Sequence, residues 1–270
     1  MSKRLPDGAC DSHAHVYPGG FAYDPGAPYE MPELNFSDYA SFARPLGIDR
    51  TVFATPNLYG VDNSSLEATL KAAHGTGRGI ANVRPDVDEE TLVRLTRAGV
   101  CGARLFRHNR YGYGIENLGS MCERLAPHGW HVDFLPGQVS DIEPFGDVIE
   151  RSTIPVVFDH LGKAKPSELD SPGFLTLLRL LTETDHVWVK LSSWYRQSDR
   201  PDFADMKPVA LAILDARPDR VVWGSNWPHP GHHGETPSDE MLLDQALEWL
   251  GSDARIKQVF ADNPARLYKF

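Results

Sequence analysis

The sequence predicts a single-domain (β/α)8 barrel, also called a TIM barrel, over residues 1–270. Short apolar runs alternate with amphipathic stretches, and eight strand–helix units can be placed along the chain. Several apolar runs, such as IPVVFD (154–159) and RVVWG (220–224), are almost continuously hydrophobic, as parallel strands covered by helices are. A length of 270 residues suits one such barrel and leaves no room for a second domain.

Both kinds of element can be placed by their periodicity and end signals. The predicted strands are Gly8–Asp11, Arg50–Thr55, Gly79–Val83, Gly102–Phe106, His131–Leu135, Pro155–Asp159, Val187–Leu191 and Arg220–Gly224. The predicted helices are Ser37–Leu46, Ser64–His74, a stretch between Asp88 and Gly99, Asn117–Ala126, Asp141–Ser152, Gly173–Glu183, Phe203–Ala216 and Ser238–Leu250. Asp88 is a predicted N-cap, and Thr236–Asp239 is a predicted capping box. The segment Pro18–Pro32 is expected to form a long loop over the mouth of the barrel.

An open doubly wound sheet is the main alternative fold. It would require a glycine-rich phosphate-binding turn after the first strand, where this chain has His-Ala-His. The sequence therefore favours the closed barrel.

Composition restricts the classes of partner. The formal net charge of −10 disfavours nucleic acid and anionic membranes, but a few arginines in a cleft can still bind an anionic small molecule. No apolar run approaches the length of a membrane span, and residues 1–8 lack an apolar signal region. The three cysteines, Cys10, Cys101 and Cys122, form no metal-ligand pair and suit a reducing compartment. We expect a cytoplasmic protein that binds a small molecule, with homo-oligomerisation open.

A pair of histidines follows the first predicted strand. Catalytic side chains of barrels come from the C-terminal ends of strands. In an extended segment, residues two apart point to the same side, so His13 and His15 are expected to face the interior together. Two convergent imidazoles can bind a divalent metal or donate hydrogen bonds to a carbonyl oxygen.

Two later strand ends carry comparable residues. His160 directly follows the sixth predicted strand, where a barrel places an inward polar side chain. The eighth predicted strand leads into GSNWPHP (224–230), which is the most specific local pattern of the chain. Asn226 and His229 of this turn are therefore further catalytic candidates.

Cationic and aromatic side chains near the strand ends are candidates for substrate binding. The guanidinium group of arginine suits bidentate binding of a carboxylate, and the ammonium group of a lysine can bind the same negative charge. Lys190 lies within the seventh predicted strand, and Asp133 of the fifth is expected to face inward with its role open. The substrate-binding candidates are Arg104, Arg107, Arg110, Lys163, Tyr195, Arg196 and Trp227.

Four motifs together resemble the amidohydrolase-related family (amidohydrolase 2). They are DSHAHV (11–16), FDHLGK (158–163), VVWGSNWPHP (221–230) and ADNPARLYKF (261–270). The similarity runs from near residue 9 to the last residue, and the closest branch contains 2-pyrone-4,6-dicarboxylate lactonase, sulfomuconolactone hydrolase and galactarolactone isomerase. The resemblance implies a (β/α)8 fold and chemistry on lactones of small acids.

The resemblance also implies roles for individual residues. The positions that match the carbonyl-polarising histidines of the metal-independent lactonases are His13, His15 and His160. Those that match the carboxylate-binding arginines are Arg104 and Arg196, with Arg107 as a further candidate. His229 is implied to line the same pocket.

Asn226 departs from the usual pattern of the family, which has aspartate there. That aspartate takes a proton from the attacking water or binds metal, and an amide does neither well. The lactone isomerase has asparagine in its corresponding turn, so Asn226 is consistent with a natural residue as well as with an engineered substitution. His13, His15 and His160 are the candidate ligands of a single zinc ion, while the loss of the anionic ligand favours no metal at all.

Lactone opening builds negative charge on the carbonyl oxygen, which His13, His15 and His160 can stabilise. If water attacks, His229 is the predicted base. If a hydroxyl group of the substrate attacks instead, the reaction is an isomerisation in which Asn226 orients that hydroxyl. We expect a hydrolase that opens a small carboxylate-bearing lactone. A sugar-lactone isomerase, a zinc-dependent decarboxylase and a catalytically inactive binding protein are the alternatives.

Overall fold

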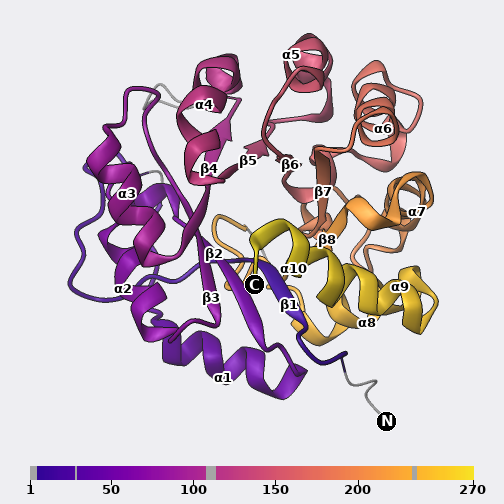
Figure 1. Cartoon of the computed structure of the whole chain (residues 1–270). Coiled ribbons are helices and arrows are strands. Elements are labelled where there is room, and N and C mark those ends of the chain that lie inside the picture. Colours follow the sequence, from indigo (N-terminus) through magenta and orange to yellow (C-terminus); the bar gives the residue numbers. More distant parts are fainter. Residues whose placement is uncertain (1–4, 28, 108–113, 233–235) are drawn as a thin grey trace.

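The protein folds as the predicted (β/α)8 barrel. In the computed structural model, eight parallel strands lie side by side in the order β1 to β8, with helices around the outside (Figure 1). The structure describes residues 5–27, 29–107, 114–232 and 236–270. Within these residues, no helix is both long enough and apolar enough to cross a membrane.

The strands pair in parallel, each with the next along the chain. They are β1 (Cys10–Ala14), β2 (Arg50–Ala54), β3 (Gly77–Ala81), β4 (Val100–Phe106), β5 (His131–Leu135), β6 (Val156–Phe158), β7 (Val187–Leu191) and β8 (Val221–Trp223). The bounds of β5 and β7 agree with the sequence prediction, and the other strands shift by a few residues. The largest shift concerns β1, which extends to Ala14 and therefore contains His13.

The turn after β8 joins the last strand to the first. The backbone nitrogen of Asn226 donates to the carbonyl oxygen of His13 at 2.8 Å, and the nitrogen of His15 donates to the carbonyl of Trp227 at 2.8 Å. A Cβ atom on Gly224 would lie only 2.6 Å from the Cβ of His13, so this close approach requires glycine. These contacts bring the first and last sequence motifs together.

Most helices cover the outer face of the sheet, whereas the last, α10 (Asn263–Tyr268), lies across one end of the barrel (Figure 1). The helices are α1 (Phe36–Leu46), α2 (Ser64–Ala72), α3 (Glu89–Ala98), α4 (Leu118–Leu125), α5 (Gly146–Glu150), α6 (Pro172–Glu183), α7 (Lys207–Ala216), α8 (Asp239–Leu250), α9 (Asp253–Lys257) and α10 (Asn263–Tyr268). The side chains of Asp88, Ser171 and Ser238 accept backbone hydrogen bonds at the starts of α3, α6 and α8.

Two predicted helices are shorter than expected. The helix predicted over 141–152 is α5 alone, preceded by 3-10 turns, because Pro144 lacks a backbone donor and interrupts a continuous helix. The helix predicted from Phe203 begins at Lys207, with Pro208 in its first turn.

The C-terminal segment closes one end of the barrel. Leu267 and Tyr268 pack against a buried cluster that includes Val52, Ile80 and Val222 from inside the sheet. The guanidinium groups of Arg50 and Arg78 lie 5.4 and 4.6 Å from the ring centroid of Phe270. With this end filled by apolar and aromatic side chains, the polar groups of the interior gather toward the opposite end.

Candidate active site

A cavity of about 330 Å³ opens at the C-terminal ends of the strands. It is lined by His15, Tyr29, Pro56, Asn57, Arg104, Leu135, His160, Lys163, Arg196, Asn226, Pro230 and Gly231. Tyr29 comes from the loop after β1, which packs its aromatic residues against Tyr17, Leu58 and Tyr59. Among the described residues, the lining contains three cationic side chains and no acidic one. The cavity therefore favours an anionic ligand, although the whole chain carries a charge of −10.

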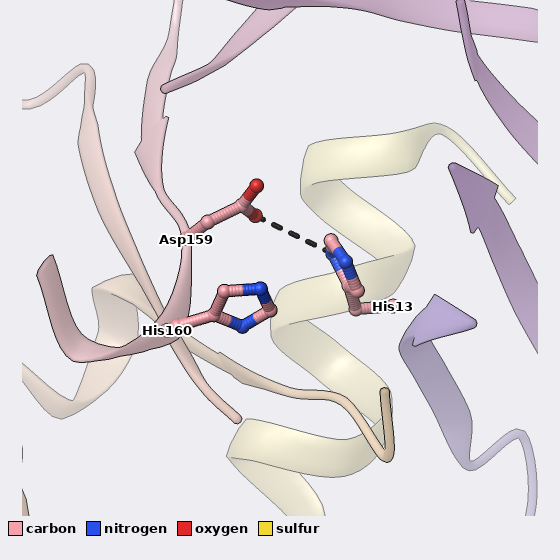
Figure 2. A group of neighbouring side chains, drawn as sticks. All are labelled: His13, Asp159 and His160. Carbon is pink, nitrogen blue, oxygen red and sulfur yellow. Dashed lines mark ion pairs between the residues drawn. The ribbon is translucent and has the colours of Figure 1, made fainter. Parts of the chain in front are cut away.

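Three imidazoles converge beside this cavity. The ring centroid of His13 lies 4.9 Å from that of His15 and 4.8 Å from that of His160. Figure 2 shows the rings of His13 and His160 turned toward each other, with Asp159 beside them. Burial lowers the pKa of His13 to about 4 and holds the pKa values of His15 and His160 well below 6.5. All three rings are therefore neutral at pH 7.

Hydrogen bonds assign different roles to the rings of His13 and His15. The Nδ1 of His15 lies 2.8 Å from the carbonyl oxygen of Ala54, which can only accept, so Nδ1 carries the proton and Nε2 keeps a lone pair. The Nδ1 of His13 lies 3.1 Å from Nζ of Lys190, which can only donate, and 3.4 Å from Oδ1 of Asp159, which can only accept. The shorter contact, with Lys190, favours a lone pair on Nδ1 and the proton on Nε2. His15 can therefore accept a proton, whereas His13 can donate a hydrogen bond.

The ring of His160 is oriented by a hydroxyl group. Its Nδ1 lies 2.8 Å from Oγ of Ser192, and either atom can be the donor. His160 follows β6 in a 3-10 turn and has a φ of 54°, an unusual backbone conformation for a residue with a side chain. This turn directs the imidazole into the cavity.

Buried charges behind the imidazoles form a closed network. Oδ2 of Asp159 accepts from Nε and Nη2 of Arg104 at 3.1 and 2.9 Å, and its Oδ1 lies 3.2 Å from Nζ of Lys190 and 3.4 Å from Nδ1 of His13. Lys190 also donates to Asp133. Burial alone would raise the pKa of Asp159, but the positive charges of Lys190 and Arg104 hold it well below its usual value. Burial opposes the charge of Lys190, while Asp133 and Asp159 raise its pKa.

This network bears on metal binding. One potential ligand atom from each of His13, Asp159 and His160 lies within 4.8 Å of the others, whereas His15, one of the three predicted candidate ligands, is not part of that group. Both oxygens of Asp159 already contact cations. A divalent ion at this point would be repelled by Arg104 and Lys190. The residues present therefore do not fit a resident divalent metal.

A second set of polar residues links the turns after β7 and β8. Nδ2 of Asn226 donates to the hydroxyl oxygen of Tyr195 at 2.8 Å. The same hydroxyl lies 2.9 Å from Nδ1 of His229, and Nε2 of His229 lies 3.0 Å from Oδ1 of Asp239. Both ring nitrogens of His229 are thus bonded, and this ring is absent from the lining of the cavity.

Two cations at the mouth of the site remain available to a ligand. Lys163 and Arg196 line the cavity and also a neighbouring hollow of about 540 Å³. Tyr195 lines this hollow as well. Burial lowers the pKa of Lys163 to about 8, and the positive charge of nearby Arg196 contributes to this shift. Nη2 of Arg196 donates to the carbonyl oxygen of Pro230, which holds its side chain across the turn after β8.

Two of the predicted substrate-binding residues lie elsewhere. Arg107 pairs with Asp141 at 3.7 Å and lies over the ring of Phe145. Successive residues of a strand face opposite sides, so residues three positions apart also do, and Arg107 projects away from Arg104. Trp227 stacks on Phe42 in α1 at 5.9 Å between ring centroids. Neither residue lines the cavity. Arg110 lies outside the described residues.

Several residues of the site were not among the sequence candidates. Tyr29 and Asn57 belong to loops without a recognisable motif. Asp239 begins α8, and the sequence predicts only a structural role for it, as part of the capping box at the start of this helix. Asp159 stands in the FDHLGK motif, but its role as the partner of Arg104, Lys190 and His13 depends on strands distant in sequence.

Comparison with known proteins agrees with this architecture. The family model of Amidohydrolase matches residues 10–270. A 4-sulfomuconolactone hydrolase from Hydrogenophaga intermedia is 31% identical and aligns with 98% of this chain and 89% of its own length. A 2-pyrone-4,6-dicarboxylate hydrolase from Comamonas testosteroni is 30% identical over 98% of this chain and 91% of its own length.

Similarity extends to an isomerase and to a solved structure. A D-galactarolactone isomerase from Agrobacterium fabrum is 29% identical over 98% of this chain and 92% of its own length. An apo crystal structure from Agrobacterium tumefaciens superposes with a TM-score of 0.89 at 27% identity, covering 99% of this chain and 97% of that one. The resemblance of the sequence motifs is thereby confirmed, and the chain belongs to the amidohydrolase family.

Proposed function

We propose that this protein opens the ring of a small lactone that carries at least one carboxylate. The observation that supports this proposal is the convergence of three neutral imidazoles beside a cavity whose lining, in the part of the chain that the structure describes, has cationic and no acidic side chains. The relatives named as lactone hydrolases, with about the same chain length, support the same reaction class.

The chemistry divides between a donor and a base. As water attacks the carbonyl carbon, negative charge develops on the carbonyl oxygen, and the Nε2–H of His13, which has no hydrogen-bond partner among the described residues, can stabilise it. A preorganised donor of this kind typically contributes about 3–4 kcal/mol. The lone pair on Nε2 of His15 accepts the proton of the water. The ring C–O bond then breaks, and the His15 imidazolium returns the proton to the leaving alkoxide.

The proposal that His15 is the base replaces the hypothesis that His229 takes the proton from the attacking water. Both ring nitrogens of His229 are engaged, by Tyr195 and by Asp239. His15 has its Nδ1 bonded to the backbone and its ring at the cavity, so its other nitrogen faces the reacting group.

Substrate carboxylates are proposed to bind to Arg104, Lys163 and Arg196. Arg104 donates to Asp159 through Nε and Nη2, so its third nitrogen, Nη1, can contact a ligand. Lys163 and Arg196 lie further out, where they line both the cavity and the neighbouring hollow.

A sugar-lactone isomerase is the second candidate, and Asn226 favours it. An amide cannot remove a proton from water near neutral pH. When a hydroxyl group of the substrate attacks its own carbonyl, an effective molarity of about 10⁵ M or more reduces the demand on a base. The 29% identical relative named as an isomerase is in accord with this reaction.

The test is a panel of lactones followed by NMR of the products, with metal analysis of the native protein. We expect turnover of a sugar-acid lactone, a muconolactone or a pyrone dicarboxylate, and we expect it to survive chelation. Free acid identifies the hydrolase, and an isomeric lactone without free acid identifies the isomerase.

Other outcomes would contradict the proposal. Lactone turnover that requires stoichiometric zinc would overturn the metal-independent mechanism, whereas zinc-dependent release of CO2 from a carboxylic acid would favour a decarboxylase. Binding without turnover of any lactone would favour a catalytically inactive binding protein.

A further inference from the structure

The hydrogen-bond chain of Asp239, His229, Tyr195 and Asn226 begins at a helix N-terminus. Asp239 is the first residue of α8, and Ser238 caps that helix. The partial positive charge of a helix N-terminus stabilises a carboxylate, so Asp239 is anionic and can only accept hydrogen bonds. One end of the chain therefore has a fixed polarity.

The polarity of this end determines every later bond. Because Asp239 accepts at 3.0 Å, Nε2 of His229 carries a proton. In the neutral form of the ring, Nδ1 then holds the lone pair. The hydroxyl of Tyr195, 2.9 Å from Nδ1, must then donate to it. Burial raises the pKa of Tyr195, so the hydroxyl keeps its single proton. Having donated that proton to His229, Tyr195 can only accept from Asn226, at 2.8 Å.

We propose that Asp239, His229 and Tyr195 are positioning residues whose directed hydrogen bonds require a donor at position 226 and present the amide oxygen of Asn226 to the cavity. Asn226 lines the cavity. Because its Nδ2 is bound to Tyr195, Oδ1 is the amide atom that is left for a ligand. There it accepts a hydrogen bond from a hydroxyl group of the substrate. The direction of the chain does not depend on the reaction, whereas the contact with a hydroxyl group rests on the proposed function.

The same chain explains why asparagine suits this position. A carboxylate at 226 would accept from Tyr195, which would then have no proton for Nδ1 of His229. The imidazole could restore the chain only by carrying protons on both nitrogens, between Asp239 and Tyr195. Among the described residues, the charged or titratable groups near this ring also include His232, whose ring packs on Tyr195, and Arg196, bonded to Pro230 in the same turn. Asn226→Asp should therefore convert His229 into an imidazolium.

Nitrogen-15 NMR of histidine-labelled full-length protein near neutral pH tests this inference directly. We expect the wild-type His229 to be neutral with its proton on Nε2, and the Asn226→Asp protein to have His229 protonated on both nitrogens. The matched control is Asn57→Asp, which adds the same charge to the lining of the cavity outside the chain and should leave His229 neutral. A wild-type proton on Nδ1, or a neutral His229 in Asn226→Asp, would overturn the proposal.

A second variant keeps the test decisive if Asn226→Asp does not fold. Tyr195→Phe removes the acceptor of the Asn226 amide, so we expect faster exchange of its side-chain amide protons and a clear change in their chemical shifts. Unchanged amide signals would contradict the chain. Because these readouts need no turnover, an inactive protein with the expected signals would disprove the lactone reaction and leave the chain intact.

Discussion

The site has two parts that hold their side chains in different ways. The floor consists of His13, His15, Arg104, Asp133, Asp159 and Lys190. The rim consists of His160, Lys163, Tyr195, Arg196, Asn226 and His229. Floor residues lie in strands or directly after them, and their charges are paired with one another under complete or nearly complete burial. Rim residues lie in the turns after β6, β7 and β8.

Backbone conformation separates the two parts. Nine described residues other than glycine have a positive φ, and six of them lie in the turns after β6, β7 and β8. They include His160, Lys163, Asn226 and His229, with φ between 54° and 63°. Such conformations cost about 1–3 kcal/mol each and persist where the surrounding structure fixes them. The floor thus provides a fixed electrostatic environment, while the rim uses strained turns to aim individual groups at a ligand.

The largest expected effect follows from breaking the floor at Lys190. Lys190→Met keeps the length of the side chain but leaves Asp133 and Asp159 without their shared cation. Removing one partner of a buried ion pair costs about 3–5 kcal/mol, which is a large part of the stability of a domain. We expect the free energy of unfolding in urea to fall by that amount, with loss of activity because Nδ1 of His13 loses its donor.

The control for this variant is Lys207→Met. Lys207 pairs with Glu248 at 2.7 Å, but both side chains are exposed. Surface pairs contribute about 0–1 kcal/mol, so this change should scarcely alter unfolding. Equal losses in the two variants would show that the floor is not an electrostatic network.

The next effect concerns the proposed base. His15→Gln leaves a polar side chain at the cavity but removes the basic ring nitrogen, so we expect kcat to fall by about 10²- to 10⁴-fold. His128→Gln, on a histidine paired with Glu89 on the outer surface, should leave kcat unchanged.

The pH profile of the wild type tests the same residue. Burial holds the pKa of His15 well below 6.5, and the neutral ring is the active form. The value of kcat/KM should therefore stay level as pH falls through 6.5 and decline only at a clearly lower pH. A decline centred at or above pH 6.5 would exclude His15 as the base.

The same two parts explain how much of the site was predictable. His13, His15, His160 and Asn226 could be found because each directly follows or ends an apolar run, and strand ends of a barrel meet at one face. Arg104 was a candidate because of its charge near a strand end and the family resemblance, and it lines the cavity. Arg107, three positions on, was named on the same grounds, although the alternation of side chains turns it outward.

Partnerships across the barrel could not be predicted in this way. Asp159 is 55 positions from Arg104 and lies in a different strand–helix unit, so no local pattern pairs them. The chain from Asp239 to Asn226 depends on the start of α8 lying beside the turn after β8. Trp227 belongs to the most specific motif, yet its ring packs on α1, whose position only the folded chain determines. Sequence patterns thus located the side chains but not their contacts.

The smallest expected effect distinguishes the rim from the floor by the kinetic constant it changes. The pKa of Lys163 is lowered to about 8, so its ammonium group loses its proton well below the usual 10.5. Binding of a substrate carboxylate should weaken as pH rises through about 8. Loss of one charged hydrogen bond is worth about 1.5 kcal/mol, so KM should rise about tenfold while kcat changes little.

Two variants isolate this titration in measurements of KM from pH 6.5 to 9.5. Lys163→Arg keeps its charge over the whole range and should show a low, level KM, whereas Lys163→Met should show a high, level KM. A wild-type KM that does not change across pH 8 would remove Lys163 from substrate binding. If instead kcat follows the titration and KM does not, Lys163 acts on the reacting atoms and not on a substrate carboxylate.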